Sequence, residues 1–236
     1  MSKLVLIRHG KSKWNALNLF NGWVDTKLSD EGTGQAEKGG KLLKGKNIPF
    51  DQAYTSVLTR AIQTLHIVLE EIGQLWIPEE KSWRLNERHY GALQGLNKKS
   101  SAEKWGAEQV HTWRRSYDVL PPLQKKIQKS ITVDGVTYPA LDRRYDKLDP
   151  KTLPLGENLQ VTLKRVIPFW EDKIAPDLRS GKNIIIAAHG NSLRALTKYI
   201  ENISDEDIIN LEIATGQPIV YDFDYDLNVI NKEFLS

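Results

Sequence analysis

Two stretches far apart in the chain share one order of features: an apolar run, a His-Gly pair and then polar residues. LVLI at 4–7 precedes Arg-His-Gly at 8–10, and NIIIAA at 183–188 precedes His-Gly-Asn at 189–191. Neither run alternates with polar residues, which indicates strands buried on both faces. After the second run, apolar residues recur at helical spacing between 193 and 200. Strands of this kind that lead into helices are typical of a parallel α/β sheet.

Other segments supply the helices that such a sheet needs. Apolar residues from Leu58 to Ile72 keep to one face of a helix, and Thr55 or Ser56 is placed to cap its start. Residues 29–44 are also predicted to be helical, although four glycines between 32 and 40 weaken that helix. We therefore predict an α/β fold with a mainly parallel central sheet flanked by helices on both faces.

The second half of the chain carries three weaker local signals. Residues 158–170 fit an amphipathic helix that Pro168 kinks or ends. SDED at 204–207 fits the start of a helix with a capping box, with Asp in place of Glu or Gln. At 221–226 aromatic residues alternate with aspartates, which predicts a half-buried strand.

Residues from about 84 to 153 interrupt this pattern. They are rich in Lys, Arg and Trp, contain Pro-Pro at 121–122 and Asp-Gly at 134–135, and have little periodicity. The strand and helix pattern resumes afterwards. We therefore expect residues 1–236 to form a single domain, with a long helical and loop insertion at about 84–153 over the sheet.

The composition limits the classes of partner. The 33 Lys and Arg against 30 Asp and Glu leave a formal net charge of +3, too small to predict binding to nucleic acid or a membrane surface. The chain has no cysteine, which excludes disulfides, thiolate metal sites and cysteine nucleophiles. No apolar run approaches the roughly 20 residues of a membrane helix, and the residues before Arg8 do not form a signal peptide. We expect a cytoplasmic protein without a nucleic-acid or membrane partner.

The two His-Gly turns are expected to face one pocket, because ligands of open α/β sheets bind at the carboxyl ends of the strands. A single such turn can simply end a strand, so the prediction depends on the pair. The five histidines include no i,i+4 pair, and neither turn has a carboxylate neighbour, so no metal site is predicted. Arg8 adjoins His9, and Arg60 lies in the first turn of the predicted helix, where the helix dipole also favours an anion. These features favour a phosphate site.

A neutral imidazole between guanidinium groups can attack phosphorus while the cations neutralise the transferring group. The reaction also needs a proton donor for the leaving oxygen, and Glu87 in LNERHYGALQG is the candidate, with a surface salt bridge as the alternative. A second basic cluster holds Lys98, Arg114 and Arg115. This cluster suits a substrate with several negative charges, although a solvated face or a nucleic-acid contact has similar composition.

Together these segments resemble the 2,3-bisphosphoglycerate-dependent phosphoglycerate mutases of the histidine phosphatase superfamily. The resemblance covers nearly the whole chain, in the order LIRHGKSKWN, NGWVDTKLSDEG, YTSVLTRAIQTL, LNERHYGALQGLNK, WRRS, RVIPFW and IIAAHGNSLRAL. RHG alone marks only the superfamily. NERHYGALQGLNK and the following WRR are more specific to the mutases.

The resemblance implies a role for each matching position. His9 is the expected nucleophile, and Glu87 the expected proton donor and acceptor. The phosphoryl group is expected to be held by Arg8, Arg60, His189, Asn15, Gly190 and Asn191. The remaining substrate-binding residues are expected to be Gly10, Ser12, Asn21, Gly22, Tyr90, Lys98, Arg114 and Arg115.

The implied activity is the interconversion of 3-phosphoglycerate and 2-phosphoglycerate in glycolysis and gluconeogenesis, through a phosphohistidine primed by 2,3-bisphosphoglycerate and without a metal. The resemblance also implies a homodimer or larger homo-oligomer. One alternative is a phosphatase of the same superfamily that acts on a small phosphomonoester, with water as the acceptor. Another is a phosphate-binding module without turnover.

The sequence departs from the family pattern at several positions. Lys11 and Lys13 stand where acidic or amide residues are commoner, and Asn21 replaces a commoner threonine. Residues 156–158 differ from the usual turn before the following helix. The chain also stops soon after its last strand, without the longer tail that some members carry over the site, a difference that bears on how water is excluded from the site.

Overall fold

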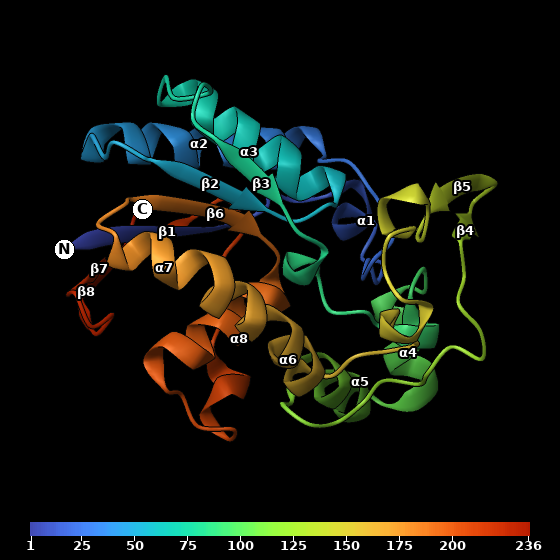
Figure 1. Ribbon diagram of the computed structural model, residues 1–236. Helices are drawn as coiled ribbons and strands as arrows, with labels where there is room; N and C mark the ends of the chain where they lie inside the picture. The colour runs from blue at the N-terminus through green and yellow to red at the C-terminus, as the bar shows by residue number, and fades with distance from the viewer.

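The computed structural model describes all 236 residues and is built on one six-stranded sheet (Figure 1). In spatial order the strands are β3, β2, β6, β1, β7 and β8, with bounds Glu79–Lys81, Gln52–Thr55, Ile184–Ala188, Ser2–Arg8, Pro218–Phe223 and Val229–Phe234. The first four strands are parallel to one another. β7 pairs antiparallel with β1, and β8 pairs antiparallel with β7. The predicted mainly parallel central sheet is therefore confirmed.

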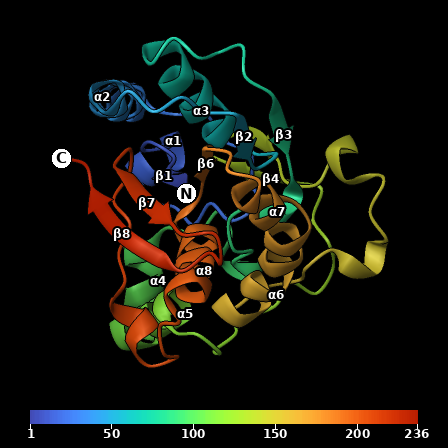
Figure 2. The same cartoon turned by 60° about the vertical axis from the view of Figure 1, so that its left-hand side comes forward.

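Helices cover both faces of this sheet, as predicted. Figures 1 and 2 show α2 (Asp30–Lys46) and α3 (Thr59–Glu71) on one face, with α6 (Leu159–Phe169), α7 (Ala175–Arg179) and α8 (Gly190–Glu201) on the other. Successive residues of β1 supply two separate cores. Leu4 and Leu6 pack in one cluster with residues of α6, α7 and α8, whereas Val5 and Ile7 pack in another with residues of α2 and α3. This two-sided burial is the physical reason why the strand is apolar throughout.

The residues of the predicted insertion lie beyond the carboxyl ends of the strands (Figure 1). They form α4 (Lys98–Trp105), α5 (Ala107–Arg115) and the hairpin of β4 (Ser130–Val133) and β5 (Val136–Pro139). Short 3-10 helices span Trp83–Leu85, Gly91–Leu93, Arg143–Tyr145 and Pro150–Thr152. The segment packs on the N-terminal part of the chain around α1 (Lys13–Ala16), because Ile131 and Val133 contact a cluster that contains Trp14.

The predicted cap of α3 is wrong. Thr55 is the last residue of β2, and the Ser56 hydroxyl accepts from the Leu58 N–H at 3.1 Å, which lies before the helix begins at Thr59. Its start is held by Asp25, whose carboxylate accepts hydrogen bonds from the Thr59 N–H and hydroxyl at 2.7 Å each. Asp25 lies 34 residues earlier in the chain, so local spacing gave no sign of this contact.

Three local predictions need correction or refinement. Regular α-helical hydrogen bonding ends at Phe169, one residue after Pro168, and the helix continues as a π segment, Trp170–Ile174. The Ser204 hydroxyl accepts from the Asp207 N–H at 2.9 Å, as a cap would, but the helix that begins there is only a 3-10 helix, Asp207–Asn210. Tyr225 lies beyond the end of β7 and is 74% exposed, so it is not part of the strand.

None of the helices combines the length and the apolar character that crossing a bilayer requires.

Candidate active site

The two His-Gly turns meet at one edge of the sheet. β1 and β6 are neighbouring parallel strands whose last residues, Arg8 and Ala188, are paired. The residue that follows each strand is a histidine, so His9 and His189 lie side by side. The His9 N–H donates to the Ala188 carbonyl oxygen at 2.9 Å. The His9 and His189 rings lie 4.9 Å apart between centroids, in an edge-to-face arrangement.

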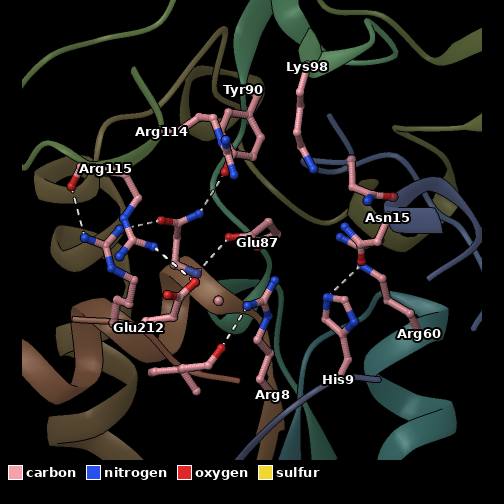
Figure 3. A pocket seen from close by; sticks show the side chains of 15 residues that line it. Arg8, His9, Asn15, Arg60, Glu87, Tyr90, Lys98, Arg114, Arg115 and Glu212 are labelled. Atoms are coloured by element: carbon pink, nitrogen blue, oxygen red, sulfur yellow. Dashed lines mark hydrogen bonds and ion pairs between the residues drawn. The ribbon is translucent and has the colours of Figure 1, made fainter. Parts of the chain in front are cut away.

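A pocket opens at this edge and gathers most of the predicted site residues (Figure 3). The predicted residues that line it are Arg8, His9, Asn15, Asn21, Arg60, Glu87, Tyr90, Lys98, Arg114, Arg115, Gly190 and Asn191. Arg8, His9 and Arg60 lie together at one end, and Tyr90, Arg114 and Lys98 lie at the other, with Glu87 between them (Figure 3).

Four predicted residues lie behind the lining instead of in it: Gly10, Ser12, Gly22 and His189. Gly22 accepts a hydrogen bond from Arg60 Nη2 at 2.8 Å through its carbonyl oxygen. The buried Ser12 hydroxyl donates to Asn15 Oδ1 at 2.9 Å and accepts from Asn21 Nδ2 at 3.2 Å. Gly22 and Ser12 therefore orient side chains that line the pocket.

The pocket also contains three residues that sequence reasoning missed: Arg194, Glu212 and Ile213. Arg194 lies three residues after Asn191 on α8, so helical spacing places both on one face of the helix. That spacing was a usable signal. Glu212 and Ile213 lie in an irregular segment after the last 3-10 helix, where no local pattern points to a site.

The tautomer of His9 follows from its neighbours. Its Nδ1 lies 2.6 Å from the Gly10 carbonyl oxygen, which can only accept, so Nδ1 carries the proton. Nε2 then has a free lone pair and accepts a weak hydrogen bond from Arg60 Nε at 3.3 Å. Burial, together with the charges of Arg60 and Arg8, holds the pKa of His9 well below its usual value. His9 is therefore a neutral imidazole with its nucleophilic nitrogen beside a guanidinium group.

The polar groups around His9 include two buried nitrogen atoms without a partner. Arg60 uses Nη1 and Nη2 on the carbonyl oxygens of Val24 (2.9 Å) and Gly22 (2.8 Å), which fixes its guanidinium. Arg8 donates from Nη1 to the Ile213 carbonyl oxygen at 2.8 Å, but its Nε has no partner. The Nδ1 of the buried His189 is also unpartnered, while its Nε2 contacts the Ser56 hydroxyl at 2.7 Å. Buried polar groups are normally satisfied, so this arrangement fits a ligand with anionic oxygens.

Glu87 is buried and held at the start of α8. Its Oε1 accepts hydrogen bonds from the backbone N–H of Arg88 at 2.8 Å and of Asn191 at 3.0 Å. The second contact places the carboxylate at a helix N-terminus, where a negative charge is favoured. Glu87 thus places a buried carboxylate between the two ends of the pocket (Figure 3).

The far end of the pocket is strongly basic. Burial lowers the pKa of Lys98. Burial and the positive charges of Arg115 and Arg88 lower the pKa of Arg194 to about 9. The pKa of Tyr90 is also lowered, because neighbouring cations, Arg88 above all, outweigh the effect of burial, which would raise it. Counted over the whole pocket, six cationic side chains face two carboxylates, which favours a ligand with several negative charges.

No group of three or more His, Asp or Glu residues in the structure is arranged to hold a metal ion. The fold and the pocket together define an α/β protein whose pocket suits an anion and holds a neutral histidine among arginines.

Comparison with known proteins agrees with this description. The model of the histidine phosphatase superfamily (branch 1) matches residues 4–131 and 128–233. The chain is 67% identical over 236 residues to the 2,3-bisphosphoglycerate-dependent phosphoglycerate mutase of Lactobacillus acidophilus, and 58% identical over 235 residues to that of Enterococcus faecalis, with 100% of both chains covered in each case. The solved structure of a mycobacterial glucosyl-3-phosphoglycerate phosphatase is similar, with a TM-score of 0.71, 20% identity and coverage of 99% of this chain and 97% of that chain. The chain therefore belongs to the 2,3-bisphosphoglycerate-dependent phosphoglycerate mutases of the histidine phosphatase superfamily.

Proposed function

We propose that this protein interconverts 3-phosphoglycerate and 2-phosphoglycerate, a step of glycolysis and gluconeogenesis, through a phosphohistidine on His9 primed by 2,3-bisphosphoglycerate. The observation that carries the proposal is the buried neutral His9, whose Nε2 lone pair faces Arg60 at the end of a pocket with a large excess of positive charge. The names of the full-length relatives support the substrate and the primer.

The first half-reaction charges the enzyme. His9 Nε2 attacks phosphorus of the bisphosphate, and the P–O bond to the glycerate oxygen breaks as the N–P bond forms. Glu87, which enters this half-reaction as the protonated carboxylic acid, gives its proton to the departing oxygen and becomes a carboxylate. Arg8, Arg60 and His189 Nδ1 then offer donors to the phosphoryl oxygens, which fits the unpartnered atoms of Arg8 and His189.

The second half-reaction uses the same groups in reverse. Glu87 takes the proton of the free hydroxyl of a bound monophosphate as that oxygen attacks the phosphohistidine, so the bisphosphate forms again. After the bisphosphate turns in the pocket, His9 recovers the other phosphoryl group and Glu87 returns the proton. Lys98, Arg114 and Arg115 supply charge for the carboxylate and the second phosphate in either orientation. Because cations already neutralise the phosphoryl oxygens, we propose that no metal is needed.

The test is conversion of 3-phosphoglycerate to 2-phosphoglycerate, coupled to enolase, with and without trace 2,3-bisphosphoglycerate. We expect strong dependence on the primer, and turnover that survives EDTA. His9→Ala should abolish turnover and acid-labile phosphoenzyme together, while the exposed His66, which pairs with Glu79 at 2.7 Å, provides the control His66→Ala with wild-type rates. Release of inorganic phosphate without 2-phosphoglycerate would assign the pocket to a phosphatase instead.

We also propose that the protein acts in the cytoplasm, that residues 1–236 form a single domain with the insertion at about 84–153, and that it assembles as a homodimer or larger homo-oligomer, as the family resemblance implies. The packing of the insertion against the cluster around Trp14 supports the single domain. Light scattering on the purified protein tests the oligomeric state.

A further inference from the structure

A buried ion pair lies directly beneath the segment that carries Glu87. Glu157 precedes α6 and Arg165 lies within it, and their side chains are 1% and 7% exposed. Arg165 Nε donates to Glu157 Oε1 at 2.7 Å, and Nη2 donates to Oε2 at 2.9 Å. This two-point geometry matches the guanidinium fork to the carboxylate.

Both members of the pair also hold the backbone on either side of Glu87. Arg165 donates to the carbonyl oxygens of Arg84 (2.6 Å), Asn86 (2.9 Å) and Glu87 itself (2.9 Å). Glu157 Oε2 accepts from the His89 N–H at 2.8 Å, and the Glu157 N–H donates to the His89 carbonyl oxygen at 2.7 Å. Between residues 84 and 89 the pair therefore fixes backbone groups both before and after the proton carrier.

The segment needs such support because it has little regular structure of its own. It passes from a 3-10 helix, Trp83–Leu85, into irregular chain, and no strand or α-helix includes Glu87. The carboxylate is itself held only through two backbone N–H groups, those of Arg88 and Asn191. A shift of the segment relative to α8 therefore moves the carboxylate relative to His9.

Stability alone does not explain the ion pair of Glu157 and Arg165. Buried ion pairs lose much of their attraction to desolvation, and apolar replacements of similar volume are often as stable. A guanidinium that reaches one carboxylate and three carbonyl oxygens instead determines a specific backbone path. This arrangement points to a role in geometry.

We propose that Glu157 and Arg165 are positioning residues that hold the Glu87 carboxyl at the distance and angle needed for proton transfer. The inference rests on the proposed role of Glu87 as the proton carrier. The pair does not line the pocket, so it acts through Glu87 and not on the substrate.

The test is a double-mutant cycle with Glu87→Gln. Arg165→Lys keeps the charge, but one ammonium group cannot serve the carboxylate and three carbonyl oxygens together. We expect kcat to fall about 10- to 100-fold with KM within about threefold, as for a misplaced catalytic group. In the Glu87→Gln background the same substitution should cost nothing further, since no proton is left to position. Glu157→Gln, which keeps the shape of the side chain, should follow the same pattern if Arg165→Lys folds poorly.

The control is Lys198→Gln on α8, which removes a cation that is 10% exposed. Lys198 Nζ lies 2.7 Å from Asp205 Oδ1, and neither residue belongs to the Glu87 segment. This substitution should leave kcat unchanged in both backgrounds, with folding checked by circular dichroism. Equal losses from Arg165→Lys in the wild-type and Glu87→Gln backgrounds would overturn the inference and leave the proposed function intact. Wild-type turnover by Glu87→Gln would overturn the proposed role of Glu87 and the inference with it.

Discussion

At the scale of single residues, Arg194 sets the orientation of the Asn191 side-chain amide in the pocket. Arginine has only donors, so the contact of Arg194 Nη1 with Asn191 Oδ1 at 3.0 Å fixes which way the amide points. The amide nitrogen then faces Tyr90, whose hydroxyl accepts from it at 3.1 Å. Arg194 Nη2 also donates to the carbonyl oxygens of Arg115 (3.0 Å) and Ile208 (2.6 Å). One guanidinium thus orients an amide donor and ties the segment of Arg115 to α8.

Replacing Arg194 by lysine tests this role. We expect Arg194→Lys to raise KM for 3-phosphoglycerate about tenfold, equivalent to about 1.4 kcal/mol, because one ammonium group cannot hold both Asn191 and the carbonyl oxygens. The value of kcat should change less than about threefold, since the side chain does not contact His9 or Glu87. The exposed Arg179→Lys is the matched control and should leave both constants unchanged. Steady-state kinetics decide, and an unchanged KM for Arg194→Lys would contradict this role.

At the scale of elements, the start of α2 packs directly against the turn that carries His9. A methyl group on Gly10 would overlap the carbonyl oxygen of Gly32, and one on Gly32 would overlap the carbonyl oxygen of Lys11. The Lys11 carbonyl oxygen also accepts hydrogen bonds from the Ser29 N–H (2.9 Å) and hydroxyl (2.8 Å). The close contact of its backbone with Lys11 therefore explains why residue 32 is a glycine, although glycine is unfavourable within a helix.

Two substitutions in α2 separate these effects. Gly32→Ala should lower the free energy of unfolding by about 1–3 kcal/mol, because the backbone of the His9 turn has to move. It should also lower kcat, since the turn holds His9, the proposed nucleophile. Gly34→Ala, where the structure leaves open space, should raise the free energy of unfolding by about 0.5–1 kcal/mol through lower chain entropy, with kcat unchanged. Urea unfolding and turnover of both variants provide the measurement, and a stable, active Gly32→Ala would refute the close packing.

The elements that could be predicted are those whose signal is local. The apolar runs of β1 and β6 and the periodicity of α3 mark these elements directly. β3 has the sequence Glu-Glu-Lys, so no apolar pattern marks it as a strand. Its place depends on pairing with β2, which only the folded chain reveals.

The residues of the site also divide into those with a local sequence signal and those without one. The residues around His9 sit in motifs with a clear order, so sequence alone could place them together. Glu212 comes from an irregular segment and approaches Arg115 only in three dimensions, at 4.0 Å. The contact of Arg165 with the Glu87 carbonyl oxygen spans 78 residues, and such a contact leaves no trace in local spacing.

At the scale of the whole molecule, positive charge is concentrated in the pocket. The formal net charge of the chain is +3, while the pocket alone holds six cationic side chains and two carboxylates. The rest of the chain is therefore close to neutral. A field of this kind directs anionic ligands to one edge of the sheet, and its effect on association weakens as salt screens it.

The burial of three histidines makes the stability of the protein depend on pH. Burial is the main cause that lowers the pKa of His9 and His189 well below the usual value and that of His89 to about 4. The neutral forms are held by geometry too, since His89 Nδ1 accepts a hydrogen bond from the Gly91 N–H at 3.1 Å. The unfolded chain titrates near 6.5. Below that pH only the unfolded state takes up protons at these three sites, so the free energy of unfolding falls as pH falls.

We expect each of these histidines to contribute a loss of about 1.4 kcal/mol between pH 7.5 and 5.5, or about 4 kcal/mol together. Urea unfolding at several pH values measures the loss. His89→Gln should remove about a third of the pH dependence, whatever its effect on stability at pH 7.5, because one buried neutral imidazole is gone. The control His111→Ala removes an exposed histidine on α5 and should leave the pH dependence almost unchanged. A free energy of unfolding that stays constant over this range would mean that the three imidazoles gain protons in the folded state, which the donors around His9 and His89 oppose.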